Sequence, residues 1–128
     1  EEPITPRIKR FIDGYHQAYA VDHIPSPMSA AQGYDTVYIF AAAVKQARST
    51  DTHKIKAALE DLQEPVVGVI TTWHHPYSKW NPAEVNTHEA FRRDQVIMGT
   101  VKDGRVVFSN EADRARLIKN ASITKTKK

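Results

Sequence analysis

The amino-acid sequence predicts a mixed α/β fold with three main helices, one buried strand and a terminal β-hairpin. Apolar residues recur at helical spacing in three early segments, and a β-branched run follows at residues 66–72. An Asp-Gly pair at residues 103–104 then separates two short apolar runs. Of the 128 residues, 41% are hydrophobic and 26% are charged, so the chain can bury a modest core.

The first helix is predicted over residues 6–20. Its apolar residues lie three or four positions apart with charged residues between them, which is typical of an amphipathic helix. Pro6 suits the first helical turn, whereas Gly14 weakens the middle by about 1 kcal/mol relative to alanine. Residues 22–27 contain two prolines and predict a loop. The apolar stripe consists of Ile8, Phe11, Ile12, Tyr15 and Tyr19.

The second helix is expected to begin at Ser29, because Ser29 and Gln32 form a capping-box pattern. The stripe expected to face the core consists of Tyr34, Val37, Tyr38, Ala41 and Val44. Residues 49–51 (Ser-Thr-Asp) are expected to end the second helix and to begin a third. The apolar stripe of that helix consists of Ile55, Ala58, Leu59 and Leu62. Two helices joined by so short a turn should lie side by side.

The β-branched residues 66–72 predict one strand, and their unbroken apolar character predicts burial on both of its faces. Residues 73–93 show no sustained period and contain two prolines, which predicts a long ordered loop. A short helical turn is expected at residues 89–92. Such a loop either carries function or marks a crossing between structural units.

Residues 96–101 and 105–108 are short apolar runs on either side of Lys102-Asp103-Gly104. An Asp-Gly pair suits a type I′ turn, in which both central residues need positive φ, so these runs predict a two-stranded hairpin. Asn110 is then expected to cap a short helix over residues 111–119.

Charge and composition exclude several classes of function. The formal net charge is +3, but four of the 18 basic residues lie in the last ten positions, which leaves 14 basic against 15 acidic groups in residues 1–118. A nucleic-acid partner is therefore not expected. The chain has no cysteine, which excludes disulfides and thiolate metal sites. It also shows no signal peptide, no membrane-spanning apolar run, no G-x-S-x-G and no glycine-rich phosphate loop.

Five short motifs, taken in order, resemble the C-terminal part of the type I periplasmic solute-binding proteins, the branched-chain amino acid binding family of ABC transporters. Each motif alone is weak, whereas their order and spacing together are fairly specific. The resemblance covers residues 8–108, so residues 1–108 are expected to form the binding-protein segment and residues 109–128 a short helix and basic tail. The motifs occupy residues 30–37, 43–50, 51–59, 67–68 and 101–106.

The resemblance implies a two-lobed protein that closes on a small solute between its lobes. This chain would be a C-terminal fragment contributing parts of the first lobe and a hairpin near the hinge. The implied function is that of the solute-binding component of an ABC importer, which binds an amino acid or related carboxylate without cofactor or catalysis. Its implied partners are that solute and a membrane permease, and its location is the periplasm, or outside the cytoplasm on a lipid anchor. An isolated fragment would leave apolar faces uncovered and is expected to self-associate.

One part of the solute site is expected in this chain. The resemblance implies that relatives often carry an aromatic residue facing the solute just before the second helix, and Ser29 stands at that position here. Met28 and Gln32 would line the same mouth. A hydroxyl in place of an apolar wall puts simple aliphatic specificity in doubt and leaves room for a larger or more polar solute. The competing interpretation is that Ser29 only caps the helix.

Tyr34 and Asp35 match a Tyr-Asp pair of the family, but neither is expected to touch a ligand. Tyr34 is expected in the core with its hydroxyl hydrogen-bonded, and Asp35 near a helix start where the dipole favours negative charge.

The stretch WHHPYSKW, residues 73–80, places His74 and His75 between two tryptophans, and His88 follows. Zinc needs three or four converging ligands, whereas adjacent histidines on an extended chain point to opposite faces. His88 would share a helical face with Arg92. The favoured interpretation is a structural strap in which Trp73, Tyr77 and Trp80 bury area, while the histidines and Lys79 satisfy backbone groups.

Two alternatives to the transport function stay open. The first is a ligand-sensing domain of a receptor or regulator with the same fold. The second is a metal-dependent enzyme that uses the loop carrying His74, His75 and His88.

Overall fold

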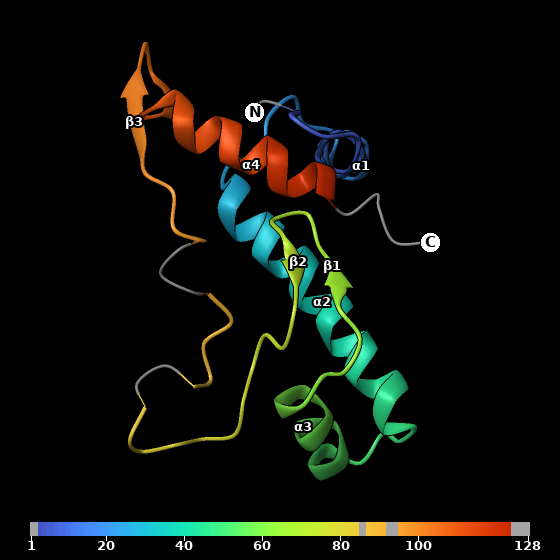
Figure 1. The fold of residues 1–128 in the computed structure, drawn as a ribbon. Coiled ribbons are helices and arrows are strands. Elements are labelled where there is room, and N and C mark those ends of the chain that lie inside the picture. Colours follow the sequence, from blue (N-terminus) through green and yellow to red (C-terminus); the bar gives the residue numbers. More distant parts are fainter. Residues whose placement is uncertain (1–2, 85–86, 92–94, 124–128) are drawn as a thin grey trace. The chain divides into compact units, whose positions relative to one another are not determined.

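The computed structural model describes residues 3–84, 87–91 and 95–123, and the chain divides into two compact units, Glu1–Ala90 and Phe91–Lys128. The first unit holds helices α1 (Pro6–Tyr19), α2 (Pro27–Ala47) and α3 (Thr52–Glu60) and strands β1 (Val66–Val67) and β2 (Thr72–Trp73). The second holds strands β3 (Gly99–Lys102) and β4 (Arg105–Phe108) and helix α4 (Glu111–Ile123) (Figure 1). The predicted mixed α/β class is confirmed.

Helix α1 confirms the predicted first helix. Thr5 caps it, because the Thr5 hydroxyl accepts a hydrogen bond from the backbone N–H of Ile8 at 3.2 Å, and Pro6 occupies the first turn. The helix ends where Ala20 adopts a left-handed conformation with φ of 52° and donates its N–H to the carbonyl of His16. No residue of α1 is fully buried, so its apolar stripe is only partly covered.

Helix α2 begins two residues earlier than the sequence predicts, and the expected cap at Ser29 is wrong. Ser26 is the N-cap residue and Pro27 the first helical residue. Proline fits this position because the N–H it lacks would have no intrahelical acceptor and its φ is already close to helical. Ser29 therefore lies inside the first turn, where its hydroxyl accepts a hydrogen bond from the Ser26 hydroxyl at 2.9 Å.

The buried face of α2 also differs from the predicted one. Ala31, Asp35, Ile39 and Ala43 are buried, whereas much of the predicted stripe faces solvent and Val37 is 65% exposed. The helix is apolar on all sides and has only one charged residue, Asp35, before Lys45. Apolar spacing therefore could not decide which side of α2 is buried.

Helix α3 confirms its prediction. The Asp51 carboxylate accepts the backbone N–H of Lys54 at 3.0 Å, which caps the helix start. The Gln46 side chain joins the ends of α2 and α3, donating to the carbonyl of Asp61 at 2.9 Å and accepting the N–H of Gln63 at 2.9 Å. α3 packs beside the C-terminal half of α2 (Figure 1). The core consists of Ile39, Ala43, Ile55, Ala58, Leu62, Val66 and Trp73.

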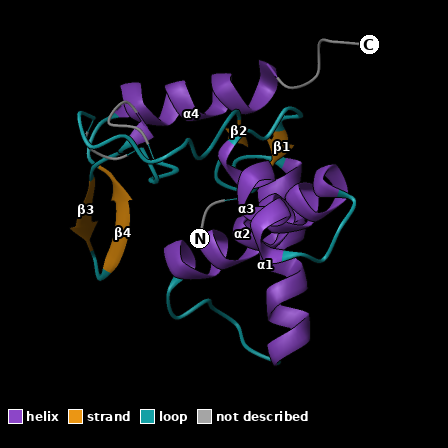
Figure 2. Cartoon of the chain, turned by 90° about the horizontal axis from the view of Figure 1, so that it is seen from below, coloured by secondary structure: helices purple, strands orange, loops and turns teal. Residues whose placement is uncertain are grey.

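The single strand predicted over residues 66–72 is wrong. The segment folds back into two short strands, β1 and β2 (Figure 2). They pair antiparallel in the register Val66 with Trp73 and Val67 with Thr72. Residues 68–71 form the turn, closed by a 2.8 Å hydrogen bond from the Gly68 N–H to the Thr71 carbonyl. The β-branched residues do form strands, but the N–H groups of Val69 and Ile70 in the turn donate to the Asp35 side chain of α2 rather than to a sheet.

The second unit confirms the predicted hairpin. β3 and β4 pair in the register Gly99 with Phe108 through Lys102 with Arg105. Asp103 and Gly104 have φ of 50° and 74°, the positive values that a type I′ turn needs. β3 starts at Gly99 rather than at residue 96.

Helix α4 is capped as predicted, since the Asn110 side-chain oxygen accepts the N–H of Asp113 at 2.9 Å, but it extends past the predicted end at residue 119 to Ile123. The hairpin and α4 belong to the same unit, whereas the boundary between binding-protein segment and tail at residue 108 stays a prediction.

Candidate functional site

The three residues predicted to touch a ligand lie on the first two turns of α2. Met28, Ser29 and Gln32 are all exposed. The spacing of four residues places Met28 and Gln32 one turn apart along the helix, with Ser29 beside them. The structure therefore brings the three side chains together on one exposed end of the helix.

Buried residues on both sides hold this helix end in place. Ile24, in the loop before the helix, is 3% exposed, and Ala31 is buried one turn into α2. Pro27 restricts the backbone between them. The exposed cluster of Met28, Ser29 and Gln32 presents a thioether, a hydroxyl and an amide. These groups suit an apolar or neutral polar part of a ligand, because none of them carries a charge.

Asp35 has a role that the sequence analysis missed. Its side chain is 1% exposed, and it accepts three hydrogen bonds: from the N–H of Val69 at 2.5 Å, the N–H of Ile70 at 3.0 Å and the indole Nε1 of Trp73 at 2.9 Å. A buried carboxylate is costly unless hydrogen-bonded, and here three donors satisfy it. A lone charge in an apolar helix was the signal that could have revealed this role.

The turn at residues 68–71 is held by two helices. Asp35 holds it from α2, and from α1 the Arg7 guanidinium donates to the Gly68 carbonyl at 2.8 Å. A side chain at Gly68 would overlap the Asp35 carboxylate and the Trp73 indole, so glycine is required by space rather than by backbone conformation. This arrangement is architectural, because both Asp35 oxygens already accept protein donors.

Tyr34 is not a core residue, contrary to the prediction. It is 40% exposed, and its hydroxyl donates to the Tyr38 hydroxyl at 3.2 Å. This hydrogen bond raises the pKa of Tyr34, and partial burial raises it further. The Tyr34 ring lies edge-on to Phe11, with ring centroids 5.3 Å apart, which joins α1 to α2.

The strap, defined here as residues 73–84 and 87–90, is only partly packed as predicted. Trp73 is buried and Tyr77 packs against the core, but Trp80 is 65% exposed, so the predicted burial of Trp80 is wrong. His74 and His75 are both exposed. The chain is not extended at His75, whose φ is 44°.

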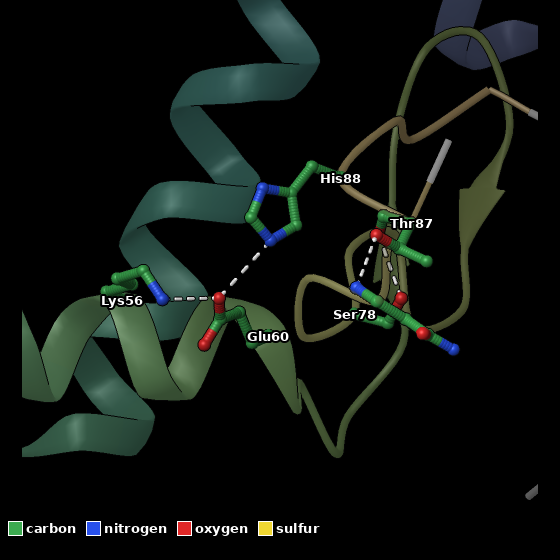
Figure 3. Close-up of polar contacts among 6 residues, drawn as sticks. Lys56, Glu60, Ser78, Thr87 and His88 are labelled. Atoms are coloured by element: carbon green, nitrogen blue, oxygen red, sulfur yellow. Dashed lines mark hydrogen bonds and ion pairs between the residues drawn. The ribbon is translucent and has the colours of Figure 1, made fainter. Parts of the chain in front are cut away.

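Ser78, Thr87 and His88 make polar contacts in the strap (Figure 3). Among the residues that the structure describes, His74, His75 and Lys79 make none of the predicted hydrogen bonds to backbone groups. His88 Nε2 lies 3.4 Å from Glu60 Oε1, and Lys56 Nζ contacts the same oxygen at 2.5 Å. The hydrogen bond from Lys56 lowers the pKa of the Glu60 carboxyl. Residues 89–91 are not helical, and Arg92, the expected neighbour of His88, lies outside the described residues.

A metal site is the alternative role for the histidines. Within residues 3–84, 87–91 and 95–123, no group of three His, Asp or Glu side chains is placed to hold a metal ion. His88 contacts the Glu60 carboxylate, which Lys56 also contacts.

A family model described as "Periplasmic binding protein" matches residues 1–90. The match covers more than half of the chain, and the chain therefore belongs to the periplasmic binding protein family. Searches of curated proteins and of solved structures gave no significant match. The matched region ends where the second compact unit begins.

Membership of the periplasmic binding protein family indicates the general role of the chain. Proteins of this family bind small solutes outside the cytoplasm and are generally not enzymes. None of the helices in the described part of the chain has the length and apolar character needed to span a bilayer.

Proposed function

We propose that this chain is part of the solute-binding component of an ABC importer, which takes up a small amino acid or a related carboxylate. Family membership supports a solute-binding role. The proposal adds the importer, its membrane permease and the class of solute. Closure of two lobes around the solute would create the surface that the permease recognises.

The observation that carries the proposal is the exposed cluster of Met28, Ser29 and Gln32 on a well-anchored helix end. These three side chains are exposed to solvent and do not pack in the core, whereas Ala31 and Asp35 on the same helix are buried. The cluster is uncharged, so it suits the side chain of an amino acid better than its carboxylate or ammonium group. The charged recognition groups would come from parts of the binding protein outside this chain.

The cluster also favours a solute class. A hydroxyl and an amide can each donate and accept hydrogen bonds, and the exposed thioether of Met28 adapts to irregular shapes. A larger or partly polar side chain fits this set better than a short aliphatic one. Aromatic carboxylates and polar amino acids therefore come before valine or leucine in the order of expected ligands.

The test is a thermal-shift screen of the complete binding protein against amino acids and aromatic carboxylates. A ligand of this class should raise the melting temperature, and Gln32→Ala should weaken its binding about five- to tenfold through one lost hydrogen bond. Gln17→Ala is the matched control, because Gln17 is an exposed glutamine on α1. A melting temperature raised by nucleotides or metals but by no carboxylate would refute the proposal.

A further inference from the structure

Tyr34 and Tyr38 lie one turn apart on the exposed side of α2. Their ring centroids are 4.8 Å apart with an interplanar angle of 39°, and the Tyr34 hydroxyl donates a hydrogen bond to the Tyr38 hydroxyl at 3.2 Å. The two residues are 40% and 50% exposed, so a reagent in solvent can reach both phenols. Two oxidisable rings are thus held together at the surface of the first unit.

Contacts on two sides fix the position of the Tyr34 ring. The ring of Phe11 on α1 lies edge-on to it, with the centroids 5.3 Å apart. The hydrogen bond to Tyr38 raises the pKa of Tyr34, so this phenol stays neutral and keeps its donor proton at neutral pH. Asp35, between the two tyrosines in the sequence, is buried and anchors this part of α2. The pair is therefore preorganised.

A second tyrosine pair allows a comparison within the same unit. Tyr15 and Tyr19 on α1 have the same spacing of four residues, with ring centroids 4.5 Å apart and an interplanar angle of 43°. In the described part of the chain, no hydrogen bond joins the hydroxyls of that pair. The two pairs therefore match in ring separation and differ in the contact between their hydroxyl groups.

We propose that Tyr34 and Tyr38 form an oxidative modification site, at which a one-electron oxidant joins the two rings by a carbon–carbon bond between the ring carbons next to the hydroxyls. In a pair linked in this way the two hydroxyls lie side by side, as they do on α2. Exposed side chains rotate within nanoseconds, so these ring carbons can meet while both rings are oxidised.

The reaction needs hydrogen peroxide and a haem peroxidase as the source of oxidising equivalents. The peroxidase removes one hydrogen atom, as a proton and an electron, from each phenol hydroxyl. The two phenoxyl radicals carry unpaired spin on the carbons next to the oxygens, and these carbons form the new bond. Each of them then loses its own hydrogen as a proton while each oxygen takes up a proton, which restores two phenols. The two hydrogen atoms removed reduce one peroxide molecule to two molecules of water.

The link would supply a covalent constraint of a kind that this chain otherwise lacks. The chain has no cysteine and cannot form a disulfide. Its family acts outside the cytoplasm, where oxidative cross-links persist. A carbon–carbon bond is also not exchanged by thiols, whereas a disulfide is. The link would join two successive turns of α2 and fix the ring that packs on Phe11 of α1. This inference does not depend on the identity of the solute.

The experiment treats the 128-residue chain, at low protein concentration, with a haem peroxidase and a limiting amount of hydrogen peroxide. The blue fluorescence of linked tyrosines should appear, and the mass of the monomer should fall by two hydrogen atoms. Fragmentation of the product should place the two ends of the link at Tyr34 and Tyr38. Oxidation of the exposed Met28 or Met98 adds oxygen instead, so mass distinguishes it.

Tyrosine-to-phenylalanine variants identify the partners. Tyr34→Phe and Tyr38→Phe should each lower the yield of linked monomer about tenfold or more, because the reaction between two positioned groups is lost. Tyr15→Phe is the matched control, since it removes one phenol from the pair without a hydroxyl contact, and it should lower the yield less than about twofold. Phenylalanine keeps the aromatic ring, so the packing between α1 and α2 is retained in each variant.

Three results would overturn the proposal. The first is a link between Tyr15 and Tyr19 as the main product in the monomer. The second is cross-linked dimers without any monomer that has lost two hydrogen atoms. The third is an equal yield of linked monomer from the wild-type chain and from Tyr38→Phe.

Discussion

Asp35 and Glu60 are both carboxylates that hold a loop against a helix, but their surroundings differ. Asp35 is 1% exposed and accepts only neutral donors, two backbone amides and an indole. Glu60 lies at a helix end and contacts Lys56 and His88, whose side chains are 64% and 48% exposed. The loop held by Asp35 is a four-residue turn, whereas the loop that includes His88 is the long strap.

The comparison shows how burial decides what a carboxylate can do. The Asp35 carboxylate and the Trp73 indole are buried and the amides of Val69 and Ile70 are partly buried, so loss of these hydrogen bonds should be costly. The partners of Glu60 are about half-exposed or more and can exchange it for solvent at little cost. Asp35 therefore fixes the turn, whereas the contacts of Glu60 are ones that solvent can replace.

Replacement of the buried carboxylate should have the largest effect. Asp35→Asn turns one acceptor oxygen into a donor and leaves at least one of the three N–H groups unpaired. The free energy of unfolding, measured by denaturant titration, should fall by about 2–4 kcal/mol. The exposed control Asp13→Asn, which breaks only the surface pair with Lys9, should change it by less than about 0.5 kcal/mol. Equal effects of the two variants would show that Asp35 is not the anchor of the turn.

The second prediction tests the space around the same anchor. Gly68→Ala places a methyl group where the Asp35 carboxylate and the Trp73 indole lie, which should cost about 1–3 kcal/mol in unfolding free energy. Gly33→Ala is the matched control, because no atom lies within 4 Å of its added methyl group. In the middle of α2 that change should stabilise the protein by about 0.5–1 kcal/mol. Effects of the same sign at both glycines would contradict the packing described for Gly68.

The third prediction concerns an exposed carboxylate that has a neutral donor. Asp51→Ala removes the acceptor for the Lys54 N–H at the start of α3 and should cost about 1 kcal/mol. Asp51→Ser keeps a capping oxygen and should restore most of the stability, as measured by denaturant titration. If Asp51→Ala lowered the free energy of unfolding more than Asp35→Asn does, burial would not determine how much each carboxylate contributes to stability.

The sequence predicted best those elements whose signals are local. Pro6, the Asp51 cap, the Asp103-Gly104 turn and the Asn110 cap each act within a few residues, and each lies where it was expected. The buried stripe of α3 was also predicted, because charged residues mark its opposite side.

The failures involve partners distant in the sequence. Asp35 meets its three donors 34 to 38 residues further along the chain, and no spacing rule connects them. Those contacts in turn bend the segment predicted as one strand. The uniformly apolar α2 hid which of its sides faces the core, and Pro27 overrode the capping box at Ser29. The ligand cluster of Met28, Ser29 and Gln32 stays a prediction.

The chain has two tryptophans, and they occupy opposite surroundings. Trp73 is 4% exposed and tied to Asp35, whereas Trp80 is largely in water with its ring beside His88. Trp73 fluorescence should therefore be blue-shifted and out of reach of iodide. Trp80 emission should be red-shifted and accessible to iodide. The molecule thus carries one optical reporter for its buried turn and another for its strap, and the two can be read in a single cuvette without any label.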